Sequence, residues 1–172
     1  GITDLVDEGD VVTVGQCAGR VLLTEGHING HISFVFDGVV FCGDTLFNAG
    51  AGNCHNGGHP AEMYETFASQ LAVLPEQTLI YPGHDYIANN LQFTLDREPD
   101  NNAAAALLDN VMDQDADNAM VSTMAQEKEV NTFFRLHSPS VIARLRESFS
   151  DLPDAPDPKT VFLKLRELRN AW

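Results

Sequence analysis

The stretch Thr24-Glu25-Gly26-His27-Ile28-Asn29-Gly30-His31 lies between two short apolar runs, at residues 21–23 and 32–36. Apolar runs of this length are typical of strands, and the two glycines permit backbone angles that other residues resist. The sequence therefore predicts two strands joined by a tight loop. This loop holds His27 and His31 where the strands meet.

Two further predicted strands end in the same manner. One ends in Phe41-Cys42-Gly43-Asp44-Thr45 and the other in Leu79-Ile80-Tyr81-Pro82-Gly83-His84-Asp85. Each of the three strand ends thus delivers a His or an Asp beside a glycine. Imidazole and carboxylate are ligands that suit zinc, iron or manganese. We therefore expect one metal-binding rim.

In this order, the motifs Gly-His-x-x-Gly-His, Gly-Asp-Thr-Leu-Phe and Tyr-x-Gly-His-Asp-Tyr resemble the metallo-β-lactamase fold superfamily, in its glyoxalase II (hydroxyacylglutathione hydrolase) branch. The resemblance covers the chain from about Asp4 to Trp172. One feature of the family is missing from these residues, namely the His-x-His-x-Asp-His metal motif of its N-terminal half. The resemblance therefore implies the C-terminal portion only.

The fold class that follows is α+β. The resemblance implies that residues 1–100 form the C-terminal half of an αββα sandwich, mostly antiparallel sheet plus helices, and that residues 101–172 form a helical glyoxalase II-type extension. The patterns predict strands at 11–14, 20–24, 32–36, 39–42 and 78–81, and helices at 59–74, 86–95, 101–112, 138–149 and 158–172. Residues 122–127 predict a short turn before a further segment at 130–136.

The resemblance also implies the chemistry of the rim. His27 would ligate one metal, Asp44 would bridge two, and His84 would ligate the second, with two zinc ions expected and iron or manganese as alternatives. Asp44 is the catalytic residue as bridging ligand, because metal-bound hydroxide is the nucleophile that attacks a thioester carbonyl. The alternative is that all three residues are polar turn residues.

Substrate contacts are implied in the same way. Tyr86 matches a residue that contacts the thiol ligand, and Arg166 and Arg169 match a basic pair that binds the glycine carboxylate of glutathione. Asn53 and His55 stand near positions where the family carries a basic and an aromatic residue, so glutathione recognition departs from the pattern there. The alternatives are core packing for Tyr86 and a solvated helix face for the arginines.

Other polar residues near the motifs have simpler interpretations. We expect His31 to be structural, bonding a backbone carbonyl or another motif side chain. We expect Asp85 to cap the helix that follows it. The sequence Cys54-His55-x-x-x-His59 is a second candidate metal cluster, but its spacing fits no established pattern.

The composition indicates which kinds of partner are disfavoured and which cellular compartment is expected. Ten Lys and Arg against 25 Asp and Glu give a net charge of −15, which disfavours nucleic acid and anionic membrane surfaces. No apolar run is long enough for a transmembrane helix. The three cysteines are widely spaced, as is typical of reduced thiols in a cytoplasmic protein.

The missing metal motif leaves three functional hypotheses open. The first is a metal-dependent thioester hydrolase of the hydroxyacylglutathione hydrolase type, incomplete in these residues and binding metal weakly or not at all alone. The second is an interaction module without catalysis that completes its sandwich with another chain or a copy of itself, since half a sandwich exposes an apolar sheet face. The third is an iron enzyme similar to the persulfide dioxygenases. Acyl group, metal identity and oligomer size stay open.

Overall fold

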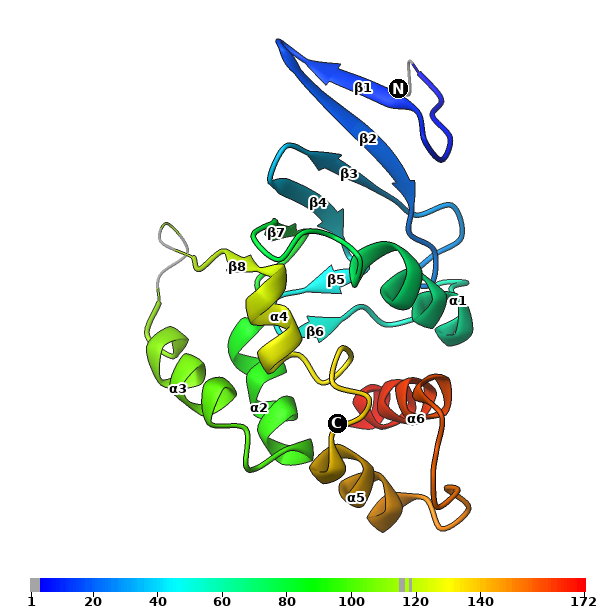
Figure 1. Cartoon of the computed structure of the whole chain (residues 1–172), viewed down its shortest axis with the longest axis vertical. Helices are drawn as coiled ribbons and strands as arrows, with labels where there is room; N and C mark the ends of the chain where they lie inside the picture. Colours follow the sequence, from blue (N-terminus) through cyan, green and yellow to red (C-terminus); the bar gives the residue numbers. More distant parts are fainter. Residues whose placement is uncertain (1–3, 115–116, 118) are drawn as a thin grey trace.

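The computed structural model describes residues 4–114, 117 and 119–172, and it has an α+β fold (Figure 1). The strands are β1 (Val11–Val14), β2 (Cys17–Leu23), β3 (Ile32–Phe36), β4 (Val39–Gly43), β5 (Leu46–Phe47), β6 (Gly50–Ala51), β7 (Leu79–Pro82) and β8 (Ser122–Thr123). The helices are α1 (Pro60–Glu65), its π-helical continuation η1 (Thr66–Leu71), α2 (Ile87–Arg97), α3 (Asn102–Val111), α4 (Met124–Val130), α5 (Pro139–Ser148) and α6 (Pro158–Ala171). None of the helices in these residues is long and apolar enough to cross a bilayer.

The main sheet has the strand order β1-β2-β3-β4-β7-β8. All neighbouring strands are antiparallel except β4 and β7, which are parallel. Because β2 and β4 are both antiparallel to β3, the strands β2, β4 and β7 run in the same direction. Their carboxyl ends therefore meet at one edge of the sheet, beside the separate hairpin of β5 and β6.

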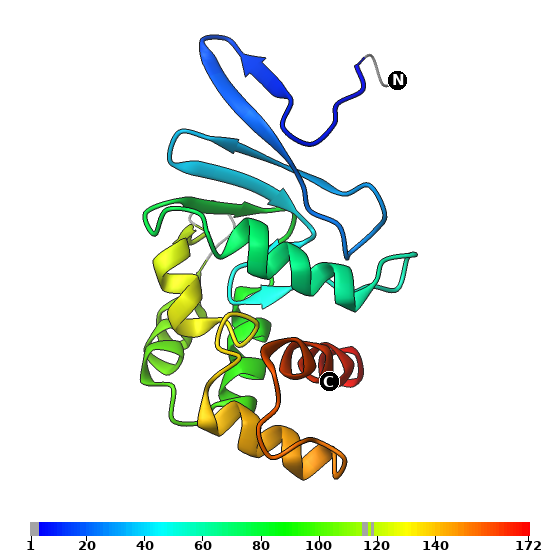
Figure 2. The ribbon, with the colours of Figure 1, turned by 45° about the vertical axis from the view of Figure 1, so that its right-hand side comes forward.

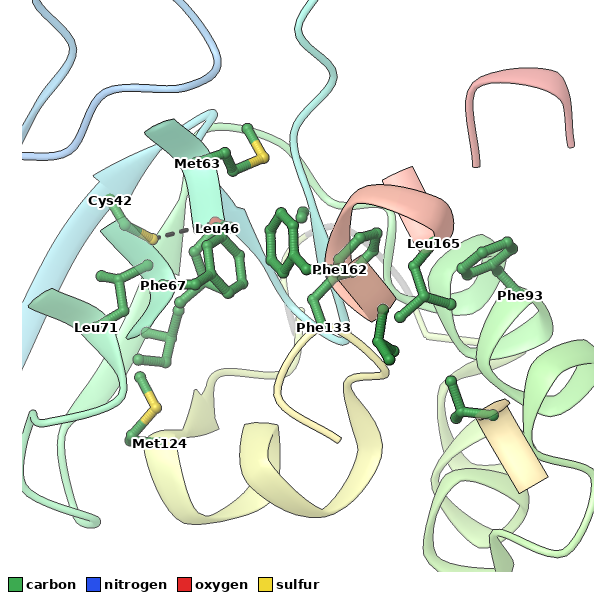
Figure 3. Packing of buried hydrophobic residues seen from close by; sticks show 14 of the residues in the cluster. Cys42, Leu46, Met63, Phe67, Leu71, Phe93, Met124, Phe133, Phe162 and Leu165 are labelled. Carbon is green, nitrogen blue, oxygen red and sulfur yellow. Dashed lines mark hydrogen bonds between the residues drawn. The ribbon is translucent and has the colours of Figure 1, made fainter. Parts of the chain in front are cut away.

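One face of the sheet packs against helices. Figure 2 shows α1 and η1 lying between the sheet and α6. Met63, Phe67 and Leu71 are buried there in one cluster with residues of β4 and β7, as their spacing predicts. The cluster continues through Phe133 to Phe162 of α6, whose ring centroids are 5.1 Å apart (Figure 3). Residues on both sides of the boundary predicted at 100 thus share one core, and the boundary itself stays a prediction.

The opposite face of the sheet carries a mostly aromatic row of side chains, which none of the helices in the described residues covers. We call Phe34, Phe36, Val39, Phe41 and Tyr81 the open sheet face, because the strand registers place them together. Phe41 is 47% exposed and Tyr81 is 37% exposed, although their rings stack at 5.4 Å. An apolar groove of about 630 Å³ lies beside them, toward β1. Contiguous exposed apolar area is common at the interaction surfaces and ligand-binding grooves of proteins.

The segment from 122 to 136 differs from the prediction. The predicted turn at 122–127 is wrong, because Ser122 and Thr123 form β8 and α4 begins at Met124. Thr123 caps this helix, since its Oγ1 accepts from the Gln126 amide while the Gln126 side chain accepts from the Thr123 amide. The reciprocal bonds satisfy two amides that a helix start leaves without partners. The residues after Val130 are not part of a regular element up to α5.

A buried carboxylate ties the helical region together. Glu98, at the end of α2, accepts from Arg135 Nε at 2.6 Å and Nη2 at 2.8 Å, from Ser138 Oγ at 2.5 Å and from Asn101 Nδ2 at 2.9 Å. Burial raises the pKa of Glu98, but the hydrogen bonds from Arg135, Ser138 and Asn101 outweigh it and leave the pKa below its ordinary value. Glu98 therefore joins α2 to the segment that leads into α5.

We expect Glu98→Gln to lower the free energy of unfolding by about 2–4 kcal/mol, because Arg135 loses its charged partner in a partly buried place. The measurement is urea unfolding at neutral pH. Since the folded-state pKa is lowered, the stabilisation is present above the ordinary pKa of a Glu and is lost as the pH falls through the folded value. Glu147→Gln, which removes an exposed ion pair with Arg144, should cost less than about 1 kcal/mol. Equal losses for both variants would contradict this role of Glu98.

Candidate functional site

Three strand ends meet around one carboxylate. His27 follows β2, Asp44 follows β4 and His84 follows β7, so the common direction of these strands brings all three to one edge. Asp44 Oδ2 lies 3.8 Å from His27 Nε2 and 3.5 Å from His84 Nε2. The structure thus brings together the three residues that the sequence placed on a metal-binding rim.

Glycines make this approach possible. Gly43 has φ +51°, a left-handed conformation that favours glycine, and it turns the chain from β4 toward Asp44. A Cβ on Gly83 would lie 2.3 Å from Asp44 Oδ1, closer than any real contact. The Gly83 amide donates to the Gly43 carbonyl at 2.9 Å, which holds the two strand ends together. Glycine is therefore favoured before Asp44 by the backbone conformation and before His84 by the close approach of the Asp44 side chain.

The ring of His27 is oriented by a backbone carbonyl. Its Nδ1 lies 2.6 Å from the Asn53 carbonyl oxygen. Because a carbonyl only accepts, Nδ1 carries the proton and donates, and the lone pair of the neutral ring is on Nε2, which faces Asp44. The side chain is only 13% exposed, so the ring has little freedom to turn away. An acceptor of this kind behind the ring, to which the second ring nitrogen donates, is typical of metal-ligating histidines.

These residues fit part of a metal site. Two imidazoles and a carboxylate are donors for zinc, iron or manganese, and two ligands of one tetrahedral ion at bonds of about 2.0 Å lie roughly 3.3 Å apart. The nitrogen–oxygen distances at the rim are close to this separation. Across residues 4–114, 117 and 119–172, however, no group of three or more His, Cys, Asp or Glu side chains is arranged to hold an ion by itself. This finding includes the candidate cluster of Cys54, His55 and His59.

His31 is structural, as expected, and it bonds a motif side chain. Its Nδ1 lies 2.9 Å from Thr24 Oγ1 and 3.0 Å from Thr45 Oγ1. Thr45 Oγ1 donates its own proton to the Thr24 carbonyl, so His31 Nδ1 is the donor toward Thr45. Burial, followed by the nearby His27 ring, lowers the pKa of His31. The neutral His31 ring of the first motif is thus hydrogen-bonded to Thr45 of the second motif.

The sequence predicts Asp85 as the cap of the next helix, but the N-cap of α2 is Tyr86, and Asp85 bonds the start of the helix from one residue earlier. Its Oδ1 accepts from the Ile87 amide at 3.1 Å, at the first residue of α2. The helix positions Tyr86, which is half exposed and lies over the rim. The Tyr86 ring centroid is 5.5 Å from that of His84 and 5.1 Å from that of Phe47. Tyr86 therefore lies at the surface beside the rim, so the alternative of core packing is wrong.

A cavity of about 210 Å³ adjoins the rim. It is lined from several elements by residues that are mostly polar: Phe47, Ala51, Asn53, His55, Tyr86, Asn90, Arg166, Arg169 and Asn170. The structure thus brings all five predicted substrate-contact residues to one cavity. Phe47 and Tyr86 belong to the cavity and contact the rim residue His84 as well.

The two arginines of α6 have different environments. Arg166 is 2% exposed and its Nη1 donates to the carbonyls of Ala51 at 3.0 Å and Gly52 at 2.8 Å. Burial lowers the pKa of Arg166 to about 10, so the side chain is still charged at neutral pH. Arg169 donates to Asn89 and Asn90. The alternative of a solvated helix face is wrong for Arg166.

Residues that support the site from behind were missed by sequence reasoning. Asn90, Glu127 and Asn131 are buried and bond the backbone around the hairpin of β5 and β6. The Thr-x-x-Gln capping signature at Thr123 would have identified α4. The inward direction of Glu127 had no local signal, because its partner Ala49 is 78 residues away.

Comparison with known proteins identifies the family. Residues 85–172 match the family model described as hydroxyacylglutathione hydrolase C-terminus. The whole chain aligns at 61% identity over 176 residues with a hydroxyacylglutathione hydrolase of Nitrosococcus oceani, covering 67% of that protein. The chain belongs to the hydroxyacylglutathione hydrolase family. A hydroxyacylglutathione hydrolase of a Polaromonas species is 60% identical, again over the whole chain and 67% of the relative.

Solved structures agree with the fold of this chain. The match to ETHE1 from Myxococcus xanthus covers 96% of the present chain and 59% of ETHE1, with a TM-score of 0.56 and 27% identity. A metallo-beta-lactamase from Staphylococcus aureus matches 95% of this chain and 44% of its own, with a TM-score of 0.53 and 21% identity, which shows the fold. The predicted resemblance to the C-terminal portion of the metallo-β-lactamase fold is therefore confirmed.

The separate environments of the arginines give a test on the chain alone. We expect Arg166→Met to lower the free energy of unfolding by about 2–3 kcal/mol, because two buried carbonyls lose a charged donor. Arg169→Met should cost less than about 1 kcal/mol, since Arg169 itself is only half-buried and one of its two partners, Asn89, is exposed. Thermal and urea unfolding of the two variants measure the difference. A smaller loss for Arg166→Met than for Arg169→Met would show that the buried bonds do not hold the loop.

Proposed function

We propose that the complete protein hydrolyses hydroxyacylglutathione thioesters. The observation that carries the proposal is that the rim and the cavity are adjacent and share a wall. Phe47 and Tyr86 line the cavity, and both rings contact His84. A thioester whose glutathione part occupied the cavity would present its acyl–sulfur bond toward the rim.

Each group of residues then has a defined task. His27, Asp44 and His84 would hold the metal, and Asp44 would offset the positive charge. A divalent ion bound there supplies activated water and polarises the thioester carbonyl. Hydrolysis joins the water oxygen to the acyl carbon, breaks the carbon–sulfur bond and releases the thiol with a proton. We propose zinc, with iron or manganese as alternatives, and weak or absent binding by these residues alone because they supply three ligands.

The cavity residues would select the glutathione part. Arg166 and Arg169 bring two positive charges to one end of the cavity, and a carboxylate is the group that complements them. Tyr86 would contact the thiol end, next to the rim. Asn53 and His55 lie at the cavity wall in place of the basic and aromatic residues expected of the family, so the affinity for glutathione depends mainly on the arginines and Tyr86.

The hydrolase is preferred over the iron dioxygenase alternative. The family match spans α2 to α6, and the identity of about 60% to two relatives extends over the whole chain.

The free thiols of Cys17, Cys42 and Cys54 support a cytoplasmic location as part of the proposal.

The activity can be tested in a chimera that joins the part of the Nitrosococcus oceani relative outside the match to this chain. We expect metal-dependent hydrolysis of a hydroxyacylglutathione, followed by loss of thioester absorbance. Asp44→Asn keeps the shape but removes the charge shared by the two histidines, so kcat/KM should fall by at least about 100-fold. Arg169→Ala should raise KM for the glutathione thioester and leave a small alkyl thioester unaffected.

The matched control is Asp37→Asn, in the exposed turn between β3 and β4, which should keep the full rate. A folded, metal-loaded chimera that hydrolyses no thioester would overturn the proposal. An Asp44→Asn variant with an unchanged rate would do the same. Either result would favour the interaction-module alternative.

We also propose that the open sheet face is a contact surface, either for the part of the family fold outside this chain or for a second copy of the chain. The expected result in sedimentation is a dimer or a larger species of the isolated chain. Phe41→Thr with Tyr81→Thr should shift it toward monomer, because the exposed rings supply the apolar area. Val73→Thr, which is exposed away from this face, is the control. A wild-type monomer that binds no hydrophobic dye would exclude self-association.

A further inference from the structure

The most buried carboxylate outside the rim is unexplained by the proposed chemistry. Glu127 of α4 has no exposed surface, and it lines neither the rim nor the cavity. Its oxygens accept from the Ala49 amide at 3.0 and 3.1 Å, from Ser122 Oγ at 2.6 Å and from Asn131 Nδ2 at 2.9 Å. A charge is buried at such cost only where its partners compensate for it, and here they come from three separate segments.

The Ala49 amide belongs to a strained turn. Ala49 lies between β5 and β6 with φ +58°, a left-handed conformation that is unfavourable for a residue with a Cβ. The carboxylate of Glu127 bonds the amide of this residue, and Asn131 Nδ2 donates to the next carbonyl, of Gly50, at 3.1 Å. Such a conformation persists only when the surroundings hold it, and these two side chains do so from α4 and its end.

The turn leads directly to the candidate site. After Gly50 the chain passes through Ala51 and Gly52, whose carbonyls accept from Arg166, and the Gly52 amide donates to the Thr45 carbonyl at 3.1 Å. The next carbonyl, of Asn53, accepts from His27 Nδ1. A change in the turn is therefore transmitted within four residues to the cavity wall and to the ring of His27.

We propose that Glu127 is a positioning residue, whose carboxylate holds the left-handed turn at Ala49 and thereby places the loop of residues 51–53 against the cavity and His27. This inference rests on the proposed function only where the cavity is taken as the glutathione site. The placement of the loop by Glu127 is independent of the ligand.

The network requires the charged form of the carboxyl group. The Ala49 amide and Asn131 Nδ2 can only donate, and the Ser122 hydroxyl, which already accepts from Asn48 Nδ2, donates to the carboxylate, which accepts at both oxygens. A proton on one oxygen, or the amide of a glutamine, places a donor against donors. Burial raises the pKa of Glu127 to about 6, so it is charged at neutral pH. Cys42 of β4 faces it, and burial, followed by the charge of Glu127, raises the pKa of this thiol to about 12, so Cys42 stays neutral.

The direct test follows the Ala49 amide by NMR in the chain itself. In the wild type its proton shift should titrate with a midpoint near pH 6, as the carboxyl group loses its charge. In Glu127→Gln the titration should be absent, and hydrogen exchange across residues 48–53 should be at least 10-fold faster at neutral pH. Glu129→Gln, on the exposed side of the same helix, should resemble the wild type in both measurements. A purely structural residue elsewhere in the core would not produce the titration.

The functional test measures binding of reduced glutathione by calorimetry. Glu127→Gln should weaken binding by about 10-fold at neutral pH, which is about 1.4 kcal/mol. Adding Ala49→Gly should restore most of it, because glycine adopts the left-handed turn without help. Rescue by a glycine would not occur if Glu127→Gln acted by loosening the whole fold. Unchanged affinity together with unchanged exchange at residues 48–53 would overturn the inference.

The role of Glu127 can still be tested if the wild type binds no glutathione or if Glu127→Gln does not fold. If the wild type binds no glutathione, the proposed ligand of the cavity is wrong, and exchange at residues 48–53 alone decides whether Glu127 places the loop. If Glu127→Gln does not fold, Ser122→Ala removes one donor from the carboxylate and should give a smaller acceleration of exchange at the same residues. No acceleration in folded Ser122→Ala would also count against the inference.

Discussion

The site depends on how the backbone of one small hairpin is satisfied. Among the strands of the described residues, β5 and β6 pair only with each other, so their outer amides and carbonyls have no sheet neighbour there. Side chains from three helices and the segment after α4 bond them instead. The pairs are Asn90 with the Asn48 carbonyl, Glu127 with the Ala49 amide, Asn131 with the Gly50 carbonyl, and Arg166 with the carbonyls of Ala51 and Gly52. The helical region thus determines the shape of a loop that belongs to the sheet.

Two buried charged side chains of opposite sign, Glu127 and Arg166, bond the backbone of this loop, and they are not paired with each other. Glu127 bonds an amide before β6, and Arg166 bonds carbonyls at its end. Each charge is compensated mainly by hydrogen bonds with peptide groups and neutral side chains. A low-dielectric interior makes such hydrogen bonds electrostatically stronger than they are in water. Arg166 lies on α6, which packs against α1 and the core and whose last turn also lines the cavity. The geometry of the candidate site and the folding of the chain are therefore coupled through the same contacts.

Local patterns were sufficient for the rim and for most elements. His27, Asp44 and His84 could be placed together because each follows a strand and a glycine, and strand direction then brings them to one edge. The motifs also led to the correct family. What local patterns could not provide were contacts between distant segments, such as Glu127 with Ala49 or Arg166 with Gly52. A buried Glu and an exposed Glu on a short helix have the same local sequence signal, and only the packed structure separates them.

The residue that follows α6, Trp172, is fluorescent and lies next to a residue that lines the cavity. Trp172 is the single tryptophan of the chain, and its ring lies 5.0 Å from the guanidinium of Arg169 and 5.6 Å from the ring of Phe93. A cation held against an indole shifts and quenches its emission, so displacement of Arg169 by an anionic guest would alter the fluorescence of this one residue. Because the ring is half exposed, the spectrum would also register the docking of α6 on α2 during refolding. The chain therefore carries a fluorescent residue at the point where the candidate cavity and the packing of α6 meet.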